Sequence, residues 1–172
     1  MKSVSCQAAA ATGRISPDRV DISQITEQLY IAAYPQDIDA SMIRDLGVSL
    51  VIHMIHGHPA HAYRQLPFRL LVLSVRDSPF IPIPIPALMS AAEEGAGAIR
   101  AGEKVLVYCR EGRHRSVAAA CSILIGLGQS AEEAMRLVKE KRPKADPYMW
   151  YIKRRILKFE QDWKHKAVAG TY

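Results

Sequence analysis

Long hydrophobic runs are missing from this sequence of 172 residues. The longest apolar stretch with a helical pattern, Val117 to Leu127, is much shorter than the roughly 20 residues that a membrane-spanning helix needs. The first twenty residues also lack the extended apolar core of a secretory signal. We therefore expect a chain with no membrane span and a cytoplasmic location.

Cysteine is scarce as well. Cys6, Cys109 and Cys121 give an odd count without paired spacing, which indicates a reducing compartment. Cys121 follows Cys109 by twelve residues, and along a helix that separation is about 18 Å, too far for a disulfide. We interpret Cys121 as a small core residue.

Patterns of nucleic-acid binding are also absent. The formal net charge is +6, which favours anionic partners in general. However, we find no helix-turn-helix, zinc-finger or RNA-platform pattern, so we expect no nucleic-acid partner.

The sequence shows no internal repeat and no sign of a second large unit. Its length and its 49% of hydrophobic residues suit one domain with a proper core. We predict a flexible segment over residues 1–19, a catalytic domain over 20–165 and a tail over 166–172. The oligomeric state stays open.

The most informative stretch present is the one from Cys109 to Ser116. Val105 to Tyr108 has the pattern of a short buried strand, and Ser116 to Ile125 has that of an apolar helix. The loop between them ends at a helix N-terminus, where unpaired backbone N–H groups and the helix dipole favour an oxyanion. We predict that phosphate is bound by the loop residues Arg110, Glu111, Gly112, Arg113, His114 and Arg115.

The residue types in this loop suit nucleophilic chemistry on phosphate. The helix N-terminus and nearby cations favour the thiolate of Cys109, which is the reactive form. Arg115 offers a planar fork that can hold two phosphate oxygens, and Gly112 allows a tight turn against a ligand. Ser116 either hydrogen-bonds the sulfur or simply starts the helix.

The C-x5-R motif followed by serine resembles the cysteine-dependent protein tyrosine phosphatases, in particular their small dual-specificity branch. The resemblance implies that Cys109 attacks phosphorus to form a cysteinyl-phosphate, that Arg115 holds the transition state, and that no metal or cofactor is needed. It also implies an upstream aspartate as the acid for the leaving oxygen. Asp77, after an apolar run and before Ser78-Pro79, fits that role, although an aspartate there can also cap a turn.

The resemblance covers roughly residues 20 to 162. Ile25 to Ile31 is similar to the first hairpin of the family, and Arg142-Pro143 with Phe159-Glu160 is similar to its C-terminal helical pair. One position departs from the pattern. The family usually has a histidine just before the nucleophile, where it orders the loop and favours the thiolate, and this chain has Tyr108.

The rest of the chain predicts an α/β fold, with a central twisted sheet flanked by helices and the phosphate-binding loop between a strand and a buried helix. Because alternate residues are proline, 81–86 is predicted as an extended connection. The capping box Ser130 to Glu133 starts a helix. The other predicted elements are helices over 38–46, 87–100 and 148–163 and strands over 48–55 and 68–75.

Four histidines lie close together in the sequence, namely His53, His56, His58 and His61. Such a group can bind a transition metal. Because these histidines lack an acidic or cysteine partner nearby and the reaction implied above uses no metal, we predict no metal site and interpret the histidines as part of a loop.

The sequence thus predicts a phosphomonoesterase acting on a phosphorylated protein or another anionic phosphate ester. Two alternatives remain. Gly112 to Arg115 is similar to a run in relatives that cleave inositol pyrophosphates, although Glu111 stands where those have a basic residue. The departure at Tyr108 leaves open a weakly active phosphate-binding module. A rhodanese-type sulfurtransferase would leave Asp77 and Arg115 without a role.

Overall fold

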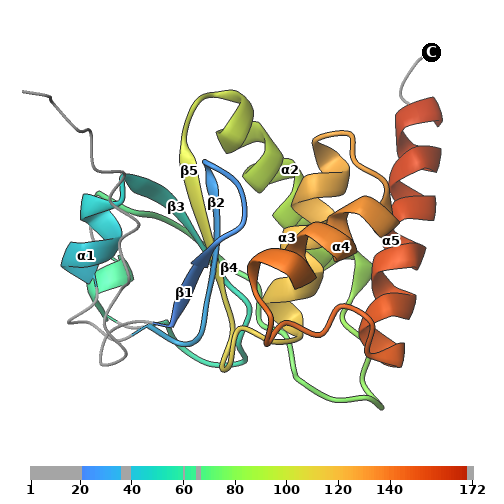
Figure 1. Cartoon of the computed structure of the whole chain (residues 1–172), viewed down its shortest axis with the longest axis horizontal. Helices are drawn as coiled ribbons and strands as arrows, with labels where there is room; N and C mark the ends of the chain where they lie inside the picture. The colour runs from blue at the N-terminus through green and yellow to red at the C-terminus, as the bar shows by residue number, and fades with distance from the viewer. Residues whose placement is uncertain (1–20, 36–39, 60, 65–66, 170–172) are drawn as a thin grey trace, which may run out of the picture.

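A five-stranded mixed sheet forms the centre of the molecule (Figure 1). The computed structural model describes residues 21–35, 40–59, 61–64 and 67–169. The strand order is β1-β2-β5-β3-β4, with β1 antiparallel to β2 and every other pair parallel. The strands are β1 (Ile22–Gln24), β2 (Leu29–Ala32), β3 (Val48–His53), β4 (Arg69–Val72) and β5 (Lys104–Tyr108).

Helices cover both faces of this sheet, as Figure 1 shows. One face carries the short helix α1 (Ala40–Asp45), and a 3-10 helix spans His61–Arg64. The other face carries α2 (Ile85–Arg100), α3 (Arg115–Gly126), α4 (Ala131–Lys141) and α5 (Trp150–Ala169). The predicted α/β architecture is therefore confirmed.

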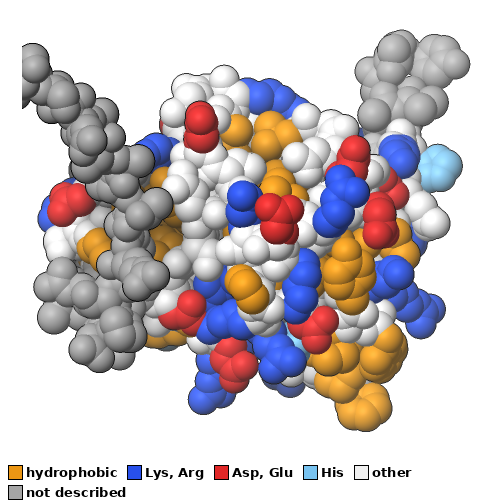
Figure 2. Space-filling view, in the orientation of Figure 1, with side chains coloured by type: hydrophobic (Ala, Val, Ile, Leu, Met, Phe, Trp, Pro, Cys, Tyr) orange, Lys and Arg blue, Asp and Glu red, His pale blue; other side chains and the backbone are white. Residues whose placement is uncertain are grey.

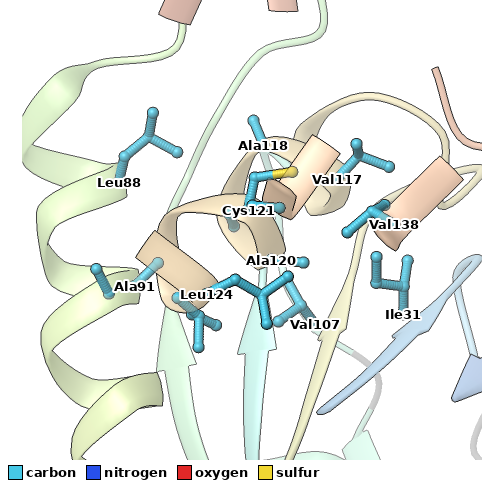
Figure 3. Close-up of a cluster of buried hydrophobic side chains, with 14 of the residues drawn as sticks. Ile31, Leu88, Ala91, Val107, Val117, Ala118, Ala120, Cys121, Leu124 and Val138 are labelled. Atoms are coloured by element: carbon cyan, nitrogen blue, oxygen red, sulfur yellow. The ribbon is translucent and has the colours of Figure 1, made fainter. Parts of the chain in front are cut away.

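Strand β5 and helix α3 form the inner part of the core. Both neighbours of β5, β2 and β3, run parallel to it, and every residue of α3 is buried. Figure 3 shows how side chains from α3, α2, α4 and the sheet meet in a cluster of buried hydrophobic residues that includes Cys121. Burial raises the pKa of the Cys121 thiol, so it stays protonated and inert. This confirms its assignment as a core residue.

Several predicted boundaries shift in the structure. Ile85 and Pro86 were expected in the extended connection, but they form the first turn of α2, where proline is tolerated because its missing N–H would be unpaired anyway. Strands β3 and β4 end earlier than expected, and α5 continues to Ala169 into the predicted tail. The expected segment 1–19 with Cys6, and residues 38–39 of the first predicted helix, lie outside the described residues.

The predicted capping box is present at α4. The Ser130 side chain accepts from the Glu133 N–H, and the Glu133 carboxylate accepts from the Ser130 N–H at 2.8 Å. This exchange fixes the start of α4, whose end brings Arg142 toward the sheet. Within the described residues, no helix is both long and apolar enough to span a bilayer.

Candidate active site

The loop from Cys109 to His114 joins the carboxyl end of β5 to the N-terminus of α3. Ligands of open parallel sheets bind at this end of the strands. Among the residues that the structure describes, no side chain caps the first turn of α3, so its backbone N–H groups can bind a ligand. Lys and Arg side chains gather on the lower part of the surface in Figure 2, where this loop lies.

Cys109 is only 1% exposed, and its Sγ lies 3.2 Å from the Ser116 hydroxyl. Either atom can be the donor, so the hydroxyl can donate to a thiolate. Ser116 is the second residue of α3, and the cap position belongs to His114. Of the two interpretations left open for Ser116, the structure thus favours contact with the sulfur over helix capping.

Arg115 is 4% exposed and is held by two contacts. Its Nη1 donates to the carbonyl of Val75 at 3.1 Å, and its Nη2 lies 3.2 Å from Asp77 Oδ2. Its Nε is buried without a hydrogen-bond partner among the described residues. Since a buried donor without a partner costs about 1–3 kcal/mol, this edge of the guanidinium is suited to an incoming acceptor.

Asp77 lies in the segment after β4, and its side chain is 37% exposed. Its Oδ1 is 3.7 Å from His114 Nδ1, while its Oδ2 contacts Arg115. The fold therefore places the predicted acid beside the predicted phosphate-binding arginine. The turn-capping alternative has no support in these side-chain contacts.

Two side chains that the sequence did not single out for the site also contact the loop. The first is Tyr151 of α5, whose hydroxyl lies 3.0 Å from His114 Nδ1. The second is Arg142, which follows α4 and is 1% exposed. In the sequence, the Arg142–Pro143 pair indicates only the C-terminal helical pair, and no local pattern predicts a contact with the loop.

Arg142 contacts the loop on the side that faces the hairpin of β1 and β2. Its Nε donates to the Gly112 carbonyl at 2.7 Å, and its Nη1 donates to the Ser23 hydroxyl at 2.9 Å, while Nη2 lies 3.0 Å from Asp21 Oδ1. Burial lowers the pKa of Arg142 to about 10, and a negative charge on Cys109 acts in the opposite direction. The guanidinium therefore stays charged at neutral pH.

Gly112 is required where the loop turns over Arg142. Its φ is +63°, a left-handed conformation that side chains disfavour. A Cβ there would contact Arg142 and would lie 2.7 Å from the Ala32 carbonyl oxygen. The predicted tight turn is thus confirmed, although the space is filled by the protein's own Arg142 and β2.

The remaining loop side chains, Arg110, Glu111 and Arg113, are exposed at the rim. The Arg113 guanidinium lies 3.8 Å from Asp146. On one side of the loop is a hollow of about 610 Å³, lined by Ile55, His56, Arg76, Asp77, Arg110, Glu111 and Arg115. On the other is a hollow of about 570 Å³, lined by Ala33, Arg110, Glu111, Arg113, Lys139, Pro143, Lys144 and Asp146.

Tyr108 is fully buried, and its hydroxyl lies 2.8 Å from Nδ1 of His53, which pairs with it across the strands. The Tyr108 side chain packs in the cluster on the α1 side of the sheet, whereas Cys109 packs on the α3 side. Burial raises the pKa of Tyr108 and lowers that of His53, so both are neutral at pH 7. A histidine is therefore present here, but it comes from β3.

Of the group of four histidines considered above, His56 lines the hollow that also contains Asp77 and Arg115. His53 belongs to β3, in agreement with the strand predicted over 48–55, and His56 contacts the Ser74 hydroxyl at 2.8 Å. Across the described ranges, no three His, Cys, Asp or Glu side chains are grouped to hold a metal.

Comparisons with known proteins give a consistent result, although no family model matches the chain. Dual specificity phosphatase 28 of Mus musculus is 36% identical over 72 residues, which are 41% of this chain and 44% of that protein. Tyrosine-protein phosphatase vhp-1 of Caenorhabditis elegans is 27% identical over 133 residues, which are 73% of this chain and 19% of that protein. The chain thus matches less than half the length of either curated relative.

Solved structures show the same fold. A mouse putative dual specificity phosphatase complexed with zinc tungstate has a TM-score of 0.75 at 24% identity, over 92% of this chain and 98% of that one. PTPMT1 in complex with PI(5)P has a TM-score of 0.75 at 18% identity, over 86% of this chain and 99% of that one. The resemblance to dual-specificity phosphatases expected from the C-x5-R motif is confirmed.

Proposed function

We propose that this protein is a cysteine-dependent phosphatase of the protein tyrosine or dual-specificity type, which hydrolyses phosphate monoesters. The observation that carries the proposal is the buried Nε–H of Arg115, which has no partner among the described residues, together with the buried contact between Cys109 and Ser116. The uncapped N-terminus of α3 adds backbone donors at the same place. Such an arrangement suits a doubly charged phosphoryl group better than a neutral ligand.

In the first step, the Cys109 thiolate attacks phosphorus and the bond from phosphorus to the leaving oxygen breaks, which gives a cysteinyl-phosphate. Asp77 transfers its proton to the leaving oxygen. Arg115 keeps Nη1 on the Val75 carbonyl and offers Nε and Nη2 to two phosphoryl oxygens. When substrate binds, Arg115 Nη2 therefore leaves its contact with Asp77 and donates to a phosphoryl oxygen.

In the second step, Asp77 accepts a proton from water, the water oxygen bonds to phosphorus, and the bond from phosphorus to sulfur breaks. The Ser116 hydroxyl, 3.2 Å from Sγ, donates to the departing thiolate. The loop amides and Arg115 stabilise the charge of the transferring group throughout. This reaction needs no metal or cofactor, and the reactive thiolate suits a reducing compartment such as the cytoplasm.

The proposed substrate is a phosphorylated protein, bound by the domain of residues 20–165. A second candidate is an inositol phosphate or a related polyphosphorylated small molecule. The hollow of about 570 Å³ favours this second candidate. Its lining supplies four cations, namely Arg110, Arg113, Lys139 and Lys144. Of the structures similar in fold, the one with PI(5)P gives the same indication. Glu111 and Asp146 in that lining oppose a very anionic ligand.

The test is turnover of p-nitrophenyl phosphate by the full chain. Cys109→Ser should lower the rate at least about a thousandfold, while phosphate still protects the chain from thermal unfolding because Arg115 and the amides remain. Arg115→Lys should lose both turnover and protection, because lysine lacks the bidentate fork. Cys121→Ala and Arg69→Lys, which alter a core thiol and a distant surface arginine, serve as controls.

Activity of Cys109→Ser near that of the wild type would refute the nucleophile. Phosphate binding by a wild type that turns over no ester would favour the binding-module alternative. A survey of phosphotyrosine, phosphoserine and phosphothreonine peptides against inositol phosphates and phosphoinositides then separates the two substrate classes.

A further inference from the structure

Tyr151 and His114 form a bridge from helix α5 to the acid of the proposed reaction. The Tyr151 hydroxyl lies 3.0 Å from His114 Nδ1, and the same nitrogen lies 3.7 Å from Asp77 Oδ1. The two rings meet edge to face, with centroids 5.6 Å apart. We propose that Tyr151 and His114 are a positioning pair that fixes the Asp77 carboxyl group for proton transfer in the phosphatase reaction proposed above.

The pair rests on a rigid support. Ile152, Ile156 and Phe159 of α5 are fully buried in the same core cluster as α3, so the start of α5 cannot slide along that helix. The Tyr151 ring also packs edge-on against Trp150 at 5.6 Å. The hydroxyl is therefore held at a fixed distance from the loop, whereas Asp77 itself lies outside any helix or strand.

The Tyr151 hydroxyl remains protonated at neutral pH and can therefore donate a hydrogen bond. Burial and the negative charges of Asp77 and Asp146 raise its pKa, which keeps the phenol protonated, although Arg113 and Arg115 act in the opposite direction. A phenol that donates to Nδ1 occupies the lone pair of that nitrogen, so the approach of Asp77 Oδ1 to 3.7 Å is a packing contact with the ring and not a second hydrogen bond. Tyr151 thereby fixes the tilt of the His114 ring against Asp77.

The need for this support arises when substrate binds. Asp77 lies between Arg115 at 3.2 Å and His114 at 3.7 Å. Once phosphoryl oxygens accept hydrogen bonds from Arg115, the His114 ring is the described contact that Asp77 keeps. A general acid acts only within hydrogen-bond reach of the leaving oxygen, and small displacements cost rate. His114 and Tyr151 therefore act through Asp77 and not on phosphorus.

The test compares leaving groups. Tyr151→Phe removes one oxygen and keeps the ring, so we expect kcat/KM to fall about tenfold for an alkyl phosphate, which depends on the acid, and by less than about twofold for p-nitrophenyl phosphate. In an Asp77→Asn background, the same change should have no further effect on the alkyl phosphate. Tyr148→Phe, an exposed tyrosine on the same stretch whose ring contacts Lys153, is the matched control.

The outcomes separate the possibilities. A loss for the alkyl phosphate alone supports the pair. An equal loss for both substrates would mean a purely structural role, and no loss would mean that Tyr151 does not position Asp77; each overturns the proposal. Failure of the proposed function would be visible earlier, in a wild type whose turnover does not depend on Cys109, and it would remove the pair along with the reaction.

Discussion

At the scale of single residues, the contact between Tyr108 and His53 redefines the departure from the family pattern. The tyrosine occupies the position before the nucleophile, and a histidine from the neighbouring strand contacts its hydroxyl at 2.8 Å. Both rings lie on the face of the sheet away from Cys109. Any influence of position 108 on the sulfur must therefore act through the backbone of β5.

We expect Tyr108→His to increase the rate at which iodoacetamide alkylates Cys109 at neutral pH, because an imidazole at the end of β5 can donate a hydrogen bond to the loop backbone and so favour the thiolate. Tyr108→Phe is the control, since it removes the hydroxyl without adding an imidazole, and its alkylation rate should match that of the wild type. An unchanged rate in Tyr108→His would mean that the loop amides, α3 and Arg142 already stabilise the thiolate fully.

At the scale of elements, the loop and the chain around Arg142 form one unit. The buried guanidinium joins the loop to the hairpin of β1 and β2, and Gly112 lets the backbone approach it. A buried charge with several hydrogen bonds is costly to disturb, because removal of a partner leaves the rest uncompensated. The shape of the phosphate-binding loop thus depends on residues far from it in the sequence.

A left-handed alanine costs about 1–2 kcal/mol. Gly112→Ala should lower the free energy of unfolding by more than this, because its Cβ would also clash with the Ala32 carbonyl and Arg142. Phosphate binding should be lost with it. Gly102→Ala is a matched control, since Gly102 has φ +86° and nothing within 4 Å of an added Cβ. Urea unfolding measures both; equal losses would show that the contact with Arg142 tolerates a methyl group.

The difference between local patterns and contacts that join distant segments explains what could be predicted from the sequence. Strand β5, helix α3, the capping box at Ser130 and the cluster of Cys109, Arg115 and Ser116 follow from local patterns, so they were predictable. The contacts of Arg142 and Tyr151 join residues that are 30 and 37 positions apart. The hydrophobic periodicity of the sequence does not indicate contacts between such distant residues. The start of α2 differs from the prediction because Pro86 lies in the first turn, where a helix accepts proline.

At the scale of the whole molecule, the buried His53 links the stability of the fold to pH. Burial is the main cause that lowers its pKa from 6.5; hydrogen bonds with the backbone of Gly57 and Ile55 raise it, and Arg115 and Arg64 lower it further. The unfolded chain therefore binds a proton at a higher pH than the folded chain. Stability falls as pH decreases below about 6.5, by up to about 1.4 kcal/mol per pH unit for this one group.

Thermal unfolding between pH 7.5 and pH 5.5 should show this decline. In His53→Asn, whose amide can still contact the Tyr108 hydroxyl, the decline should be smaller. His58→Asn, a change at an exposed histidine, should keep the slope of the wild type. If the slopes of all three proteins agree, His53 does not carry the proton linkage.

The hydrogen bond between Arg142 and Ser23 spans 119 residues, and this has a consequence for the order in which the protein is made. On the ribosome, Cys109 and Arg115 leave the exit tunnel before Arg142 does. The emerging chain therefore lacks the contact between this loop and Arg142 until Arg142 itself has emerged. A truncated product that stops within α4 therefore contains the whole C-x5-R motif without a finished site.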